Sequence, residues 1–132
     1  MKKVLLFTLV LLATISSSLL AQDTFKQVLD DFHHTLAFTY HPMIDDSNFT
    51  PIRSRSHELA QKAEALEKSF ESEKEKPEGM EQAVEQLVEQ CEALDDVIQK
   101  GATDEAIKTR LSAIHDKFHQ LESMGIKHEE EK

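Results

Sequence analysis

The chain has 132 residues, with 15 Lys and Arg against 25 Asp and Glu, and a formal net charge of -10. Its single cysteine excludes an intrachain disulfide, a cysteine-rich zinc site and attachment of haem through paired thiols. Only 3 Gly, 3 Pro, no Trp and 6% aromatic residues argue against a loop-rich β protein. The acidic balance disfavours a nucleic-acid partner, because phosphates are bound by clustered Lys and Arg. The composition is that of a small helical protein.

The first 21 residues have the pattern of a secretory signal. Lys2 and Lys3 precede an apolar run from Val4 to Ile15, and three serines separate this run from Ala21. We predict cleavage after Ala21 and a periplasmic or secreted protein with no membrane segment after cleavage. A retained N-terminal anchor is the alternative.

Four later stretches repeat apolar residues every three or four positions, which is the period of an amphipathic helix. The predicted boundaries follow from capping and breaking residues: Asp23 or Thr24 to Pro42, Thr50-Pro51 to the charged run 71–76, Pro77 to Gly101, and Thr103 to Gly125. The predicted inward-facing residues are Phe25, Val28, Leu29, Phe32 and Leu36; Ile52, Leu59, Ala63, Leu66 and Phe70; Met80, Val84, Leu87, Cys91, Leu94 and Ile98; and Ile107, Leu111, Ile114, Phe118 and Leu121.

Four helices with one apolar stripe each are stabilised by turning the stripes toward a common axis. The predicted fold is therefore all-α, an up-down-up-down antiparallel four-helix bundle over residues 22–125, followed by an acidic tail at 126–132. The connection 41–49 is expected to be the longest and least regular. A three-helix bundle with a mobile first segment is the alternative, and it would expose an apolar stripe.

Histidines are the candidate functional residues, and five of the 7 fall in two groups. His115 and His119 are one helical turn apart and can offer two imidazoles to one metal ion. The first and last helices of such a bundle are neighbours, so His33 and His41 can approach the same ion. Helical phase places His33 about 70° from its apolar stripe and His34 nearly opposite. His41 precedes Pro42, so its direction is not set by helical phase.

The remaining reactive side chains favour structural interpretations. Cys91 lies within an apolar stripe and is interpreted as a packed thiol, with metal ligation or intermolecular pairing as alternatives. His57 and His128 have no partner in either histidine group. No nucleophile motif, phosphate loop or carboxylate pair indicates an enzyme.

The segment from Leu111 to Phe118 resembles the haem-attachment segment of the cytochrome c-prime bundles. That family has cysteines where this chain has Leu111 and Ile114, followed by an axial histidine that corresponds to His115. The resemblance covers about the last 40 residues and otherwise only the architecture. It implies an exported cytochrome-like bundle, while the missing thiols exclude covalent haem. The chain is also similar to small uncharacterised secreted proteins of Bacteroidetes, which pair Phe-His…His-Pro with His-Asp-x-Phe-His, here residues 32–42 and 115–119.

Three functions follow as hypotheses. The leading one is a non-enzymatic binding protein that holds Zn, Cu or Ni through His33, His41, His115 and His119. The second is non-covalent b-type haem with His115, and His33 as the other candidate, as axial ligands. The third is a structural bundle without a cofactor that binds a protein partner or a second copy of itself.

Overall fold

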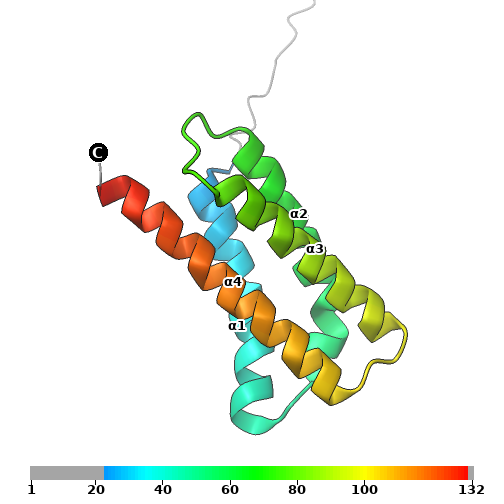
Figure 1. The fold of residues 1–132 in the computed structure, drawn as a ribbon. Coiled ribbons are helices and arrows are strands. Elements are labelled where there is room, and N and C mark those ends of the chain that lie inside the picture. Colours follow the sequence, from blue (N-terminus) through cyan, green and yellow to red (C-terminus); the bar gives the residue numbers. More distant parts are fainter. Residues whose placement is uncertain (1–22, 131–132) are drawn as a thin grey trace, which may run out of the picture.

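The computed structural model describes residues 23–130 and the side chains of residues 23–125. It contains four helices and, in this part of the chain, no strand: α1 (Phe25–Asp46), α2 (Thr50–Glu71), α3 (Met80–Gln99) and α4 (Asp104–Glu130). Each helix packs against the next in the sequence, and α4 closes back on α1 (Figure 1). The protein is a four-helix bundle. The predicted signal at 1–21 lies outside the described residues, and no helix within them is long and apolar enough to span a bilayer.

The helix starts follow local capping chemistry. The Thr24 hydroxyl accepts a hydrogen bond from the Gln27 backbone amide, and the Gln27 side chain accepts one from the Thr24 amide, which together form a capping box. The Thr103 hydroxyl accepts from the Ala106 amide and caps α4 in the same way. Gly101, with a φ of 86°, ends the turn after α3, because a left-handed backbone favours glycine. The starts near Thr24 and Thr103 and the stop at Gly101 are therefore confirmed.

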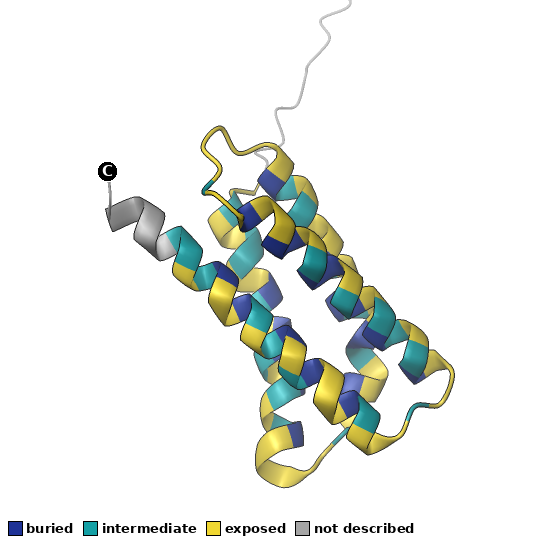
Figure 2. Ribbon diagram, in the orientation of Figure 1, coloured by how far each residue is buried: buried dark blue, intermediate teal, exposed yellow. Residues whose placement is uncertain are grey.

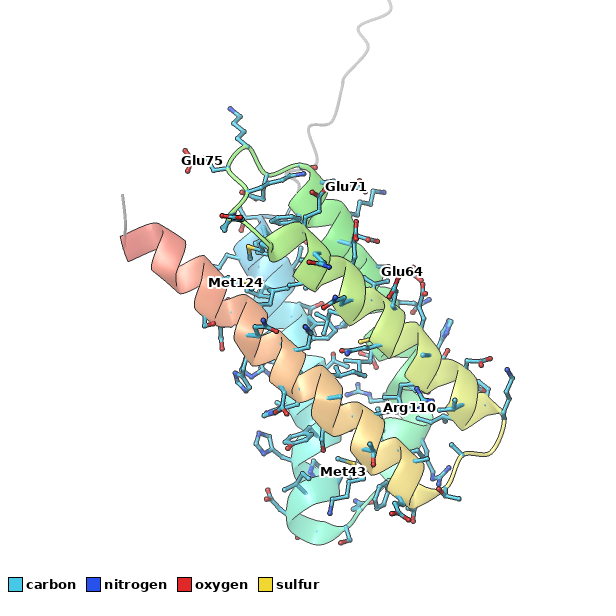
Figure 3. All side chains as sticks on the ribbon, viewed as in Figure 1. Met43, Glu64, Glu71, Glu75, Arg110 and Met124 are labelled. Atoms are coloured by element: carbon cyan, nitrogen blue, oxygen red, sulfur yellow. The ribbon has the colours of Figure 1, made fainter. Side chains whose placement is uncertain are left out.

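The prediction that Pro42 ends the first helix is wrong. α1 continues through Pro42 to Asp46 and closes with Ser47 in the left-handed region. A proline inside a helix costs about 3 kcal/mol because its missing amide leaves a carbonyl without a donor. Burial of the Met43 side chain, which is 1% exposed, offsets much of this cost by anchoring the last turn in the core (Figure 3). His41 is consequently a helical residue, with a direction set by helical phase.

Two other expected boundaries are also corrected. The first connection spans only residues 47–49, whereas the longest one, at 72–79, contains the charged run and Pro77. That run leads into α3 at Met80 rather than at Pro77, since Gly79 adopts a positive φ of 79° just before the helix. Gly125 does not stop α4, which continues to Glu130 across most of the predicted tail.

The core lies along the axis of the bundle, and the buried residues of each helix form an inward stripe (Figure 2). Every predicted inward residue of α2, α3 and α4 is buried. In α1, Phe32 and Leu36 are buried, while Phe25, Val28 and Leu29 are half-buried and pack against the core. The bundle thus uses all four predicted stripes, and the first segment is an integral helix.

A polar contact joins α2 to α3 at the edge of this core. The Ser56 hydroxyl donates to Asp95 at 2.7 Å, Gln99 donates to the same carboxylate oxygen, and the His57 ring lies 3.1 Å from the other oxygen. Burial by itself would raise the pKa of Asp95, but these three hydrogen bonds outweigh it and hold the pKa below its usual value. The ionised form of Asp95 is therefore stabilised by folding.

This contact predicts an acid-sensitive contribution to stability. A carboxyl whose pKa is lower in the folded than in the unfolded chain stabilises the fold above its unfolded pKa of about 3.9, and the contribution is lost as the pH falls through the folded pKa. We expect the free energy of unfolding in urea to fall more between pH 6 and pH 3 in the wild type than in Asp95→Asn. Parallel curves for the two proteins would show that the carboxylate contributes nothing to the acid response.

Candidate metal site between α1 and α4

His115 and His119 form the centre of the candidate site. They lie on successive turns of α4, with ring centroids 4.5 Å apart and Nε2 atoms 3.2 Å apart. Two imidazoles bound to one tetrahedral ion at about 2.0–2.1 Å each place their nitrogens roughly 3.3–3.4 Å apart. The pair is therefore already spaced like two ligands of a single ion.

Each of the two rings has a carboxylate beside its Nδ1 atom. Glu122 Oε2 lies 3.2 Å from His119 Nδ1, and a carboxylate only accepts, so this nitrogen carries a hydrogen, and in the neutral ring Nε2 presents a lone pair. With both rings neutral, the hydrogen bond between the two Nε2 atoms is then donated by His115. This assignment leaves His115 Nδ1 as a bare acceptor, and that atom is buried without a hydrogen-bond partner, 3.6 Å from Asp116.

A metal ion between the two Nε2 atoms would remove this mismatch in the neutral pair. If His115 carried its proton on Nδ1, that proton would face the Asp116 carboxylate, and both Nε2 lone pairs would face the space between the rings. A ligating histidine commonly donates its other N–H to a carboxylate in this manner, which fixes the ring and raises its basicity. The two facing Nε2 atoms and the two flanking carboxylates are therefore compatible with a metal ion held between the rings.

The electrostatic environment keeps His115 neutral. Burial lowers its pKa, and the neighbouring His119 lowers it further, while Asp116 opposes both effects. Only a neutral imidazole offers a lone pair to a metal. The His115 side chain, 21% exposed, is the more enclosed imidazole of the pair, and that of His119, at 47%, is the more open to solvent.

On α1, His33 lies close to the pair but faces a different partner. Its ring stacks on Phe118 with centroids 4.7 Å apart, and its centroid is 6.1 Å from that of His119. His33 is half-buried and His34 exposed, as helical phase predicted for both residues. The structure therefore brings His33 to the edge of the site without placing it in the same cluster.

His41 contacts Tyr40, an aromatic residue that the histidine pattern of the sequence does not indicate. Tyr40 stacks on His115 with a centroid distance of 3.9 Å and an interplanar angle of 11°, and the His41 ring lies edge-on to Tyr40 with a centroid distance of 5.8 Å. The His41 ring is mostly exposed and lies 3.9 Å from Asp45. The sequence feature that could have indicated Tyr40 is its position two helical turns after His33, which places both residues on the same side of α1.

Within residues 23–125, no group of three or more His, Cys, Asp or Glu side chains is arranged to hold a metal ion. The preformed part of the candidate site is therefore the α4 pair. Cys91 is a buried free thiol, as the packed interpretation predicted, and burial raises its pKa to about 12, so it stays protonated. His57 pairs with Asp95 instead of joining the other histidines, and the side chain of His128 lies beyond those described.

Comparison of the chain with protein-family models, with curated proteins and with solved structures finds no match.

Proposed function

We propose that this protein is an exported four-helix bundle, of up-down-up-down topology, that binds a divalent transition metal between its first and last helices. The main support is the pair His115 and His119 on α4: their Nε2 atoms are 3.2 Å apart, and the Nδ1 atom of each ring faces a carboxylate. His115 and His119 are the anchoring ligands, and His33 and His41 are the candidates to complete the site from α1. Zn, Cu and Ni all accept imidazole nitrogen.

The proposed topology is supported by the short connections at 47–49 and 100–103 and by the order of colours along the helices in Figure 1. Export is supported by the charged and apolar pattern of residues 1–21. The location of the pair at the bundle edge, where His119 is 47% exposed, favours a metal that exchanges with solution over a permanently enclosed one.

Calorimetric titration of the purified protein, made without a histidine tag, tests the proposal. We expect zinc to bind with one ion per chain near pH 7 and the affinity to fall steeply below about pH 6, because protonated imidazoles cannot ligate. Tyr40 is the only tyrosine, and the chain has no Trp, so tyrosine fluorescence reports directly on the ring stacked against His115. We expect Cu(II) or Ni(II) to quench it.

Two further measurements on the same purified protein distinguish metal binding from haem binding and from a bundle without a cofactor. If haemin gives a Soret band and the calorimetric titrations with metal ions give no binding heat, non-covalent haem at His115 is supported instead. Absence of both signals, with no metal-dependent rise in Tm, would contradict a cofactor function and leave a structural or partner-binding bundle.

A further inference from the structure

The candidate site lies on the seam of the bundle that has no covalent connection. α1 is joined directly to α2, and α4 to α3, but no loop links α1 to α4, and these two helices share the least extensive contact of the four neighbouring pairs. In Figure 3, α4 passes across α1, and Met43 of α1 and Met124 of α4 are labelled. Much of the seam is filled by half-buried aromatic and imidazole rings, including His33 and Tyr40 from α1 and His115 from α4.

His33 is the α1 side chain best placed to cross this seam to a metal. Rings that share one ion through Nε2 have centroids about 4.5–5.5 Å apart, given the usual metal–nitrogen distance. The His33 and His119 centroids are 6.1 Å apart, so His33 must move about 1 Å closer to His119 for the two rings to share an ion. Among the described residues the His33 ring nitrogens have no hydrogen bond to break, and the ring is held only by aromatic contacts.

We propose that the bound metal acts as a strut between α1 and α4, with His33 as the ligand from α1, so that metal loading and the docking of α1 stabilise each other. This inference rests on the proposed function and adds that metal binding is coupled to the docking of α1. A ligand that contacts both helices only when they are docked stabilises the docked state by mass action. By linkage, the docked state must also bind the metal more tightly than a state in which α1 has moved away.

Hydrogen exchange followed by mass spectrometry, with and without zinc, tests the strut. In the wild type we expect zinc to slow amide exchange in α1 as well as in α4. In His33→Phe, which keeps a ring to stack on Phe118 but has no ligating nitrogen, zinc should bind about tenfold more weakly and protect α4 but no longer α1. The matched control is His34→Ala, one residue along on the exposed face, which should behave like the wild type.

The outcomes separate this inference from the proposed function. Wild-type affinity and full α1 protection in His33→Phe would overturn the strut while leaving metal binding by the α4 pair intact. Zinc binding to the wild type that protects α4 alone would do the same. Failure of zinc to bind the wild type in calorimetry would overturn both, since the strut requires a bound ion.

Discussion

Replacement of both His115 and His119 by alanine is expected to abolish zinc binding. The two Nε2 atoms are the only preformed nitrogen pair among the described side chains, and loss of even an outer-shell partner of a metal ligand commonly reduces affinity about 10- to 100-fold. Removal of both anchors should therefore reduce the affinity by more than about 1,000-fold, beyond the range of calorimetric titration. The metal-dependent rise in Tm should disappear with it.

The controls for this experiment are chosen from the same protein. His34→Ala removes an exposed imidazole on α1, and His57→Ala removes one that pairs with Asp95 on the α2–α3 side. Both should bind zinc like the wild type. If the double variant retains wild-type affinity, or if His57→Ala loses as much as the double variant, the α4 pair is not the site.

The second large effect is expected in the core. Phe32 is 0% exposed, and its ring contacts that of Phe118 at 5.7 Å. Phe32→Ala should lower the free energy of unfolding by about 3–5 kcal/mol, because the substitution loses buried apolar area and leaves a cavity between α1 and α4. This is a large part of the roughly 5–15 kcal/mol that stabilises a domain. Urea unfolding followed by circular dichroism measures it.

Phe38 offers a matched control on the same helix. Its side chain is 56% exposed and makes a cation–π contact with Arg55 at 4.6 Å. Since an exposed cation–π pair contributes about 0.5–1 kcal/mol, Phe38→Ala should cost no more than about 1 kcal/mol. Equal losses in the two variants would contradict the assignment of α1 to the core and would revive the bundle of three helices with a loose first segment.

The helices could be predicted from the sequence because apolar periodicity records which face is buried. Every predicted inward residue of α2, α3 and α4 is buried, and the phase argument separated His33 from His34 correctly. The end of α1 was predicted wrongly at Pro42. The free-energy cost of a proline inside the helix is offset by burial of Met43 in the core, and the local sequence does not reveal this burial. The predicted end of α4 at Gly125 was wrong for a different reason: a glycine lowers helix propensity without forcing a stop.

The candidate site was only partly accessible from the sequence. The i, i+4 spacing predicted that His115 and His119 would meet, and they do. The spacing did not reveal that Glu122 would lie beside His119 Nδ1, nor that Tyr40 would stack on His115. Those features depend on rotamers and on the relative placement of α1 and α4, which the periodicity of a single helix does not determine.

The most direct measurement is X-ray absorption at the zinc edge of the loaded protein. The account predicts a first shell of nitrogen at about 2.0–2.1 Å, with the outer-shell scattering of three imidazoles in the wild type and of two in His33→Phe. A first shell of oxygen alone, without imidazole scattering, would contradict it.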